Sequence, residues 1–184
     1  MTTGEPSDEA IDGLIGKPVT TRGTAIAPDP VNLPMIRHWA AAFDDHNPVY
    51  VDEEAAARSR FGGIVAPPLM LQTWVMATPK ITGIADRGGS PVESDGAGPL
   101  ALLDRAGLTG TLATNSEFEI LRYLRIGEVV SADTVIEAIS DQKETRLGVG
   151  RFVTWVTTYT AGNGDVVGRQ RFRILKFRPR GAPA

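Results

Sequence analysis

Four long strand-like runs fill the second half of the chain, and they constrain the fold more than any other feature. They span residues 112–123, 129–141, 147–160 and 166–177. Short connections separate them, and the last connection, residues 161–165, carries the Asn-Gly signal of a tight hairpin. Alternation is clearest in the third run, where Val153, Trp155 and Tyr159 face one way. The runs predict an antiparallel meander with one buried face.

Three short helices are predicted before these strands. Pro34 starts the first helix, which runs to Phe43 with apolar residues at helical spacing. Asp52 caps the second helix, whose first turn is acidic and which ends near Phe61. The third helix, residues 69–77, is apolar nearly all round and must therefore be buried. A buried helix followed by a meander predicts an α+β fold with an antiparallel sheet wrapped around a central helix.

The remaining segments define the expected domain limits. Residues 1–12 are polar and are expected to form a flexible N-terminus, and a first short strand is expected near residues 19–26. Residues 78–98 are rich in Gly, Pro, Ser and Asp without any period, which predicts a long flexible loop. We therefore expect a single domain over residues 13–178, followed by a linker-like tail at residues 179–184.

The composition excludes several classes of protein. The 184 residues are 42% hydrophobic with a net charge of -3, as in a globular protein that does not bind nucleic acid. The chain has no cysteine and only two histidines, so no disulfide, thiol nucleophile or metal site is expected. The longest apolar stretch, residues 64–77, is interrupted and too short to span a bilayer. With no signal-peptide core at the N-terminus, we expect a cytoplasmic protein without a membrane partner.

Basic residues crowd the C-terminal part of the chain. They are Arg169, Arg171, Arg173, Lys176, Arg178 and Arg180. One interpretation is a solvated strand face, since charges on an outer strand protect an edge from aggregation. The other is a rim that binds phosphate groups.

Residues 43–52 and the Gly62-Gly63 pair carry the functional signal. The run reads Phe-Asp-Asp-His-Asn-Pro-Val-Tyr-Val-Asp. It resembles the signature of MaoC-like (R)-specific enoyl-CoA hydratases, in which an aspartate stands five positions before a histidine and a Phe-Gly-Gly segment follows. Asp45 stands at the aspartate position, but Tyr50 stands where the histidine belongs. The resemblance covers nearly the whole chain and implies a single hot dog fold.

Two parts of the family's catalytic machinery are replaced. In that family the aspartate and histidine handle water and proton, and a backbone N–H at the start of the central helix stabilises the enolate oxygen. Asp45 keeps the carboxylate, but the phenol of Tyr50 has an ordinary pKa of about 10 and is a poor base. The helix start falls on Pro67 and Pro68, which have no N–H. His46 could replace the lost base, although adjacent side chains in an extended loop point apart.

Such a site is similar to that of the N-terminal, FAS1-like dehydratase branch of the MaoC family. Asn-Pro-Val-Tyr and Gly-Ile-Val-Ala-Pro-Pro, both present here, are typical of that branch. Its members pair with a second hot dog that carries the working Asp and His. The chain further resembles the MaoC-like part of the larger subunits of actinobacterial steroid side-chain enoyl-CoA hydratases. The resemblance implies a heterodimer or heterotetramer that hydrates a bulky enoyl-CoA, with the CoA thioester as substrate and no cofactor.

The family threads the pantetheine arm of CoA against the Gly-Gly segment, which implies a set of binding residues here. They are Arg58, Arg60, Gly62, Gly63, Ile64 and Ala66. The two arginines would bind phosphate, because the planar guanidinium suits phosphate oxygens. Three alternatives stay open at this point: a self-sufficient homodimeric hydratase that uses Asp45 with Tyr50 or His46, a hot dog thioesterase, and a non-catalytic acyl-CoA-binding module.

Overall fold

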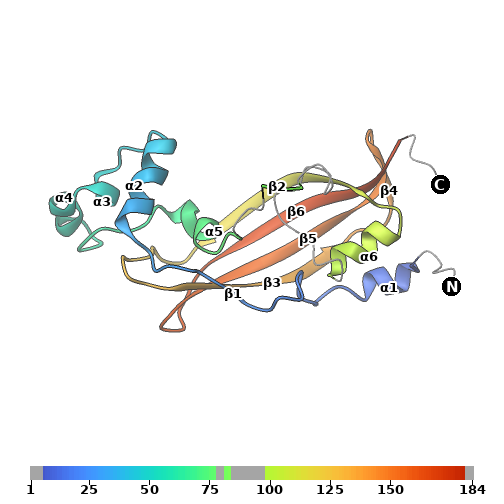
Figure 1. The fold of residues 1–184 in the computed structure, drawn as a ribbon, viewed down its shortest axis with the longest axis horizontal. Coiled ribbons are helices and arrows are strands. Elements are labelled where there is room, and N and C mark those ends of the chain that lie inside the picture. Colours follow the sequence, from blue (N-terminus) through green and yellow to red (C-terminus); the bar gives the residue numbers. More distant parts are fainter. Residues whose placement is uncertain (1–5, 78–80, 84–97, 181–184) are drawn as a thin grey trace.

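The computed structural model describes residues 6–77, 81–83 and 98–180. In this part of the chain six strands form one antiparallel sheet in the order β1-β3-β5-β6-β2, with β4 paired to the end of β5 (Figure 1). The strands are β1 (Ala25–Ile26), β2 (Gly110–Ile120), β3 (Val130–Ile139), β4 (Lys143–Glu144), β5 (Gly148–Ala161) and β6 (Val166–Pro179). The four long predicted strands are thus confirmed to within a few residues. The expected loop at residues 78–98 lies almost entirely outside the described residues.

The ends of the strands follow local hydrogen bonding. The β5–β6 hairpin is confirmed: the Ala161 N–H donates to the Asp165 carbonyl at 2.9 Å, and Gly164 takes the left-handed φ of 89° that the turn requires. β2 ends earlier than predicted because the N–H groups of Leu121 and Arg122 both turn toward the Val167 carbonyl. The first strand is also shorter than predicted, because β1 contains only Ala25–Ile26, and Pro18 makes an isolated bridge to Val135 of β3.

Three helices lie beyond one end of the sheet (Figure 1). They are α2 (Leu33–Ala42), α3 (Pro48–Val51) and α4 (Glu53–Arg58). The predicted cap is confirmed, because the Asp52 carboxylate accepts from the Ala55 N–H at 3.0 Å. Asn32 also caps α2 ahead of Pro34, although the sequence did not indicate this cap. α3 was not expected from the sequence. It forms because Asn47 caps it and Pro48 occupies its first turn.

The predicted central helix is shorter than expected. A 3-10 turn, η1 (Pro68–Met70), leads into α5 (Leu71–Trp74), and the helix ends three residues before the predicted position 77. Met70, Leu71 and Trp74 are buried against the sheet, whereas Leu69 and Met76 are 53% and 58% exposed. The prediction of burial all round is therefore wrong, because the helix packs on the sheet through one face only.

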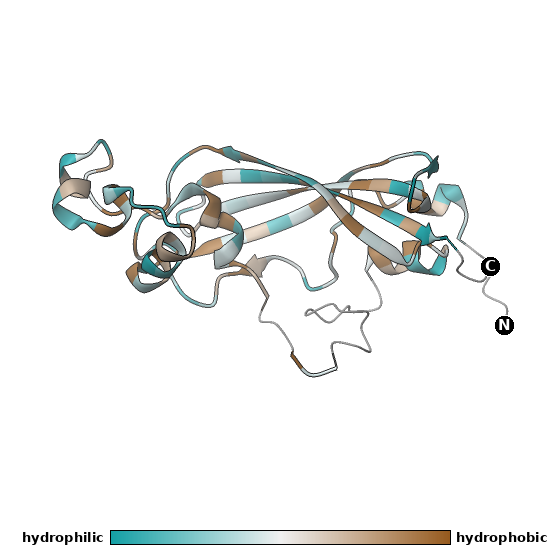
Figure 2. Cartoon of the chain, turned by 90° about the horizontal axis from the view of Figure 1, so that it is seen from above, coloured by the Kyte–Doolittle hydropathy of each residue, from teal (hydrophilic) through white to brown (hydrophobic). Residues whose placement is uncertain are grey.

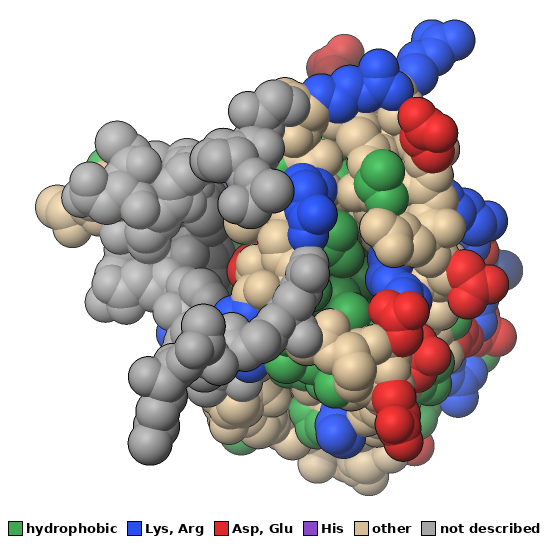
Figure 3. Space-filling view, turned by 90° about the vertical axis from the view of Figure 1, so that its right-hand side faces the viewer, with side chains coloured by type: hydrophobic (Ala, Val, Ile, Leu, Met, Phe, Trp, Pro, Cys, Tyr) green, Lys and Arg blue, Asp and Glu red, His purple; other side chains and the backbone are tan. Residues whose placement is uncertain are grey.

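Two helices cover the other end of the sheet (Figure 1). They are α1 (Asp8–Asp12) and α6 (Pro99–Arg105). α1 differs from the flexible N-terminus expected at residues 1–12: Ser7 caps it, Ile11 is buried, and Asp8 pairs with the buried Arg151 of β5 at 2.5 Å. Figure 3 shows basic and acidic side chains next to one another on this end of the molecule.

The core is divided into two clusters along the sheet. One cluster lies under α2 to α5 and includes Tyr159, and the other lies under α1 and α6 and includes Val153. Both clusters share one face of the sheet, because Val153 and Tyr159 are an even number of residues apart on β5. Apolar and polar residues alternate along the strands accordingly (Figure 2).

The basic C-terminal strand fits the first of the two earlier interpretations, a solvated strand face, better than the second. On the outer face of β6, Arg169 pairs with Glu119 at 3.0 Å and Arg171 pairs with Glu137 at 2.7 Å. Lys176 instead points inward, is 3% exposed and binds Asp104 of α6 at 2.5 Å. These cations are held by the chain's own acidic groups, so the strand does not form a rim of free positive charge.

Candidate active site

The candidate aspartate lies in the turn between α2 and α3. The Asp45 carboxylate accepts a hydrogen bond from the Asn47 backbone N–H at 3.0 Å, and Asn47 then caps α3 through the Val49 N–H at 3.3 Å. This turn holds Asp45 half-buried and places Tyr50 inside a short helix with 5% of its side chain exposed. The sequence spacing of these residues therefore does bring a carboxylate and a phenol to the same site.

The phenol of Tyr50 cannot take the place of the family's histidine as a base. Burial raises the pKa of Tyr50 above its ordinary value, and the nearby Tyr123 and Asp45 raise it further. A hydrogen bond with Asn47 offsets this only in part. Tyr50 consequently stays protonated at neutral pH, where it can donate a hydrogen bond but does not accept a proton.

His46 does not join Asp45. Its Nε2 lies 2.9 Å from the Asp44 Oδ1, and both side chains are exposed. Asp44 adopts a φ of 53°, which is rare for residues other than glycine but tolerated by aspartate. The hypothesis that His46 assists Asp45 therefore finds no support in this geometry.

The start of the central helix offers no donor from its first residues. Pro67 precedes η1 with an extended ψ of 134°, and Pro68 occupies the first helical position. Neither residue has an N–H, and no side chain caps this end. The position at which the family stabilises the enolate oxygen is thus built from two prolines, as the sequence indicated.

The two candidate arginines have different surroundings. Arg58 pairs with Glu54 one turn earlier on α4, and both side chains are exposed. Arg60 lies over the ring of Phe61 at 4.8 Å, and Phe61 packs on Tyr123 at 4.7 Å. Arg60 lines a pocket of about 390 Å³ together with Phe61, Val65, Ile120, Leu121, Arg122, Tyr123 and Arg125. Arg60 of the pair therefore faces a concave surface.

The Gly62 to Ala66 segment divides into an open part and a core part. Gly62 has a left-handed φ of 67°, and a Cβ at Gly62 or Gly63 would meet nothing within 4 Å. The space beside both glycines is open. Ile64 and Ala66 are instead 9% and 1% exposed, and the Ala66 N–H donates to the Leu124 carbonyl at 2.9 Å. Their side chains belong to the core and do not line an open surface.

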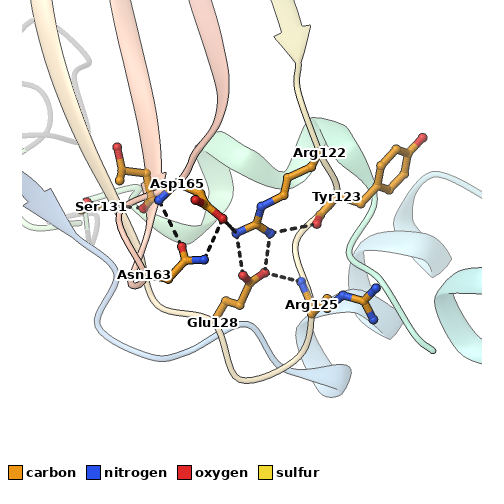
Figure 4. Close-up of polar contacts among 8 residues, drawn as sticks. Arg122, Tyr123, Arg125, Glu128, Ser131, Asn163 and Asp165 are labelled. Carbon is orange, nitrogen blue, oxygen red and sulfur yellow. Dashed lines mark hydrogen bonds and ion pairs between the residues drawn. The ribbon is translucent and has the colours of Figure 1, made fainter. Parts of the chain in front are cut away.

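An ion-pair network beside this pocket was not predicted from the sequence. Arg122 donates two hydrogen bonds to Glu128, at 2.8 and 3.1 Å, and lies 3.5 Å from Asp165 of the hairpin (Figure 4). Burial raises the pKa of Glu128, but hydrogen bonds from Arg122 and the Arg125 backbone N–H outweigh it, so the pKa lies below its ordinary value. The network fixes the turn that carries Tyr123 and Arg125. In the sequence, this network is indicated only by the opposite charges of Arg122 and Glu128, which lie close together around the turn at Gly127.

Neither a metal-binding cluster nor a membrane-spanning helix is found in the described ranges. Across residues 6–77, 81–83 and 98–180, no three His, Asp or Glu side chains come together in a way that could hold a metal ion. In the same ranges no helix has the length and apolar character needed to cross a membrane.

The chain belongs to the family of FAS1-like dehydratase domain regions, whose model matches residues 19–170. Its fold is the hot dog fold of the MaoC-like proteins. At the level of the fold it also matches the (R)-hydratase of A. caviae, with a TM-score of 0.55 at 14% identity, over 87% of this chain and 94% of that one.

Among characterised relatives, the chain is 42% identical to the probable enoyl-CoA hydratase alpha subunit of Thermomonospora curvata over 97% of this chain and 54% of the relative. It is 42% identical to the 3-oxo-4,17-pregnadiene-20-carboxyl-CoA hydratase alpha subunit of Mycobacterium tuberculosis over 86% and 49%, respectively. The chain thus spans about half the length of the curated relatives it matches. Its structure matches a chain of the ChsH1-ChsH2 complex of Mycobacterium tuberculosis with a TM-score of 0.75 at 37% identity, over 95% of this chain and 91% of that one.

Proposed function

We propose that the chain is the acyl-CoA-binding subunit of a heteromeric enoyl-CoA hydratase, and that a second hot dog subunit supplies the catalytic aspartate and histidine. The observation that carries this proposal is the state of Tyr50, a buried phenol with a raised pKa at the position of the family's base. The proline pair at the helix start supports it, since a second catalytic group is replaced there. The two alpha-subunit relatives agree with a heteromeric assembly.

The hydration reaction shows what the partner must add. A base takes a proton from water, the hydroxide adds to the β-carbon of the enoyl thioester, and an acid delivers a proton to the α-carbon. The charge on the thioester oxygen needs a donor while it develops. On this chain, Arg60 would bind a CoA phosphate, Gly62 and Gly63 would let the pantetheine arm approach the backbone, and Tyr50 would donate a hydrogen bond. The proton transfers fall to the partner.

A bulky acyl group, such as a steroid side chain, fits the shortened α5. The helix ends at Trp74, and a pocket of about 290 Å³ opens beside its C-terminal end, lined in part by Trp155 and Phe172 of the sheet. The substrate named for the Mycobacterium tuberculosis relative is a steroid-derived CoA thioester. We place the complex in the cytoplasm as a heterodimer or heterotetramer that binds neither nucleic acid nor membrane.

One observation favours a second candidate, a self-sufficient homodimeric hydratase. Asp45 keeps its carboxylate half-buried beside Tyr50, so one catalytic group is retained. Turnover of an enoyl-CoA by the purified chain separates the two candidates. We expect no hydration above the rate in buffer for the chain alone, and full activity after the partner subunit that co-purifies from the native source is added. Rapid turnover by the chain alone would establish the homodimer and contradict the proposal.

A further inference from the structure

Two segments that lie far apart in the sequence form the pocket of about 390 Å³ that Arg60 lines. One segment contains Arg60 and the glycine pair, and the other is the turn after β2 that contains Arg125. Val65 and Arg125 form an antiparallel bridge, and the Ala66 N–H donates to the Leu124 carbonyl at 2.9 Å. This pairing fixes the two segments against each other, so the pocket has defined walls.

Three arginines line this pocket, and no acidic residue of the described part of the chain lines it. Arg122 is neutralised, because its guanidinium pairs with Glu128 and Asp165. Arg125 donates its backbone N–H to the Glu128 Oε2 at 2.6 Å, but its guanidinium is directed away from that carboxylate (Figure 4). Arg60 and Arg125 make no ion pair with any residue in the ranges 6–77, 81–83 and 98–180. Two guanidinium groups at the pocket consequently keep their positive charge available for a ligand.

Both arginines are held in place by their neighbours. The Arg60 guanidinium lies 4.8 Å from the centroid of the Phe61 ring, and Phe61 packs on Tyr123 with the ring centroids 4.7 Å apart. The turn that carries Arg125 is fixed by Glu128, whose carboxylate accepts the Arg125 backbone N–H. Such support matters because both arginine side chains are exposed, and a flexible arginine loses rotamer entropy when it binds a ligand. The pair is thus partly pre-organised for an anion.

The charge of the pocket suits a phosphate monoester. A phosphate monoester carries a charge of about −1.5 to −2 at pH 7, whereas a phosphate diester carries a single negative charge. Two guanidinium groups can bind the monoester through charge-assisted hydrogen bonds. CoA has one phosphate monoester, on its ribose. The same pantetheine arm on an acyl carrier protein ends in a phosphate diester to a serine, so the two kinds of thioester differ in the group that this pocket would bind.

We propose that Arg125 is a specificity-determining residue, which together with Arg60 binds the ribose phosphate of CoA and makes the complex prefer CoA thioesters to thioesters of a carrier protein. The inference rests on the proposed hydratase function and goes beyond it, because that function assigns no role to Arg125 and no basis for the choice between the two carriers. The glycine pair agrees with this placement. Gly62 follows Arg60 by two residues, and a Cβ at Gly62 or Gly63 would meet nothing within 4 Å, so a pantetheine arm can pass along the backbone beside the two arginines.

The test compares two thioesters of one saturated acyl group, which the complex cannot hydrate. One thioester is formed with CoA and the other with dephospho-CoA, which lacks only the ribose phosphate. Calorimetric titration of the chain assembled with its co-purifying partner gives both dissociation constants at low salt. We expect the complex to bind the CoA thioester about tenfold more tightly than the dephospho-CoA thioester. Arg125→Ala should weaken binding of the CoA thioester by about tenfold and leave binding of the dephospho-CoA thioester nearly unchanged.

Two further variants complete the comparison. Arg146→Ala, a matched exchange at an exposed arginine outside the pocket, should change neither dissociation constant. Arg125→Gln also removes the charge, and it decides the outcome if Arg125→Ala does not fold or assemble. The same acyl group on the acyl carrier protein of the native source is the third ligand. We expect it to bind more weakly than the CoA thioester, and we expect loss of the Arg125 charge to narrow this difference.

The outcomes separate the inference from the proposed function. Equal weakening of the CoA and dephospho-CoA thioesters by loss of the Arg125 charge would show that Arg125 does not bind the ribose phosphate, and no weakening of either would remove Arg125 from the site. Either result would overturn the inference alone. Failure of the complex to bind any of these thioesters would overturn the proposed function as well.

Discussion

Arg58 and Arg60 are two positions apart, but their surroundings give them different roles at the residue scale. Arg58 is neutralised by Glu54, whereas Arg60 lines the pocket with Arg122 and Arg125 and makes no ion pair within the described part of the chain. Of these two arginines, Arg60 is therefore the one at which a phosphate group of CoA would meet free positive charge. The sequence could not separate the two residues, because the difference depends on the i,i+4 contact on α4 and on the stacking of Arg60 over Phe61.

Arg60→Ala should weaken acyl-CoA binding by about 1 to 2 kcal/mol at low salt, because a charge-assisted hydrogen bond to phosphate is lost. The loss should shrink as ionic strength rises. Arg58→Ala is the matched control and should leave the dissociation constant nearly unchanged. Calorimetric titration at two salt concentrations measures both variants. Equal losses for the two arginines, or no loss for Arg60→Ala at low salt, would remove Arg60 from the site.

Glu128 should contribute to stability in a pH-dependent way. Its pKa is lowered in the folded state, so its contribution is fully present above the unfolded-state pKa of about 4.3 and is lost as the pH falls through the folded-state pKa. Glu128→Gln should cost about 2 kcal/mol of unfolding free energy at pH 7, and the difference from the natural chain should disappear in acid. Urea unfolding of both proteins between pH 7 and acid measures the difference in unfolding free energy. The more exposed ion pair of Arg171 with Glu137 is the control. Glu137→Gln should lower the free energy of unfolding by much less than Glu128→Gln does. A pH-independent difference would contradict the role assigned to the network.

At the scale of elements, the sequence predicted the long strands well and the helices less well. The strand runs carry a strong period of two, which packing on one face of the sheet then satisfies. The helix predicted at residues 69–77 ends at Trp74, and the prediction of burial fails at Leu69 and Met76, whose side chains are more than half exposed. α1 and α6 are too short to show a helical period. Their positions depend on long-range contacts, such as Asp8 with Arg151, that the local sequence does not show.

The docking of α1 can be tested with two isoleucines of similar position. Ile11 is 3% exposed in the second core cluster, whereas Ile15 is 47% exposed. Ile11→Ala should lower the free energy of unfolding by about 2 to 4 kcal/mol, because it leaves a cavity beneath α1. Ile15→Ala should change it by less than about 0.5 kcal/mol. Similar small effects of both substitutions would mean that the N-terminal segment is frayed, as the sequence alone suggested.

At the scale of the whole molecule, the sheet presents one long strand at its edge. The strand order places β1 and β2 at the two edges, and β1 has two residues whereas β2 has eleven. Leu112 on β2 is 47% exposed, and the strand pairs on one side only, with β6. Long exposed edges with apolar residues are a liability for an isolated protein. The edge strand is therefore the surface that we expect a second hot dog to cover.

Assembly should be visible by size-exclusion chromatography and by amide hydrogen exchange. We expect the chain to elute with its partner as a dimer or tetramer, and we expect the amides of β2 to gain protection on assembly while those of the central strand β5 change little. A soluble monomer at micromolar concentration that the partner does not alter would contradict this expectation.

Exchange of the retained carboxylate shows which of the two subunits carries out the proton transfers. Steady-state hydration by the assembled complex is measured for Asp45→Asn and, separately, for replacement of the histidine that the partner is proposed to carry. We predict that Asp45→Asn lowers turnover by less than about tenfold, whereas loss of the partner's general acid or base lowers it by about a hundredfold or more. A loss of about a thousandfold on Asp45→Asn, with folding and assembly intact, would contradict the proposed role of the partner and assign the proton transfers to this chain.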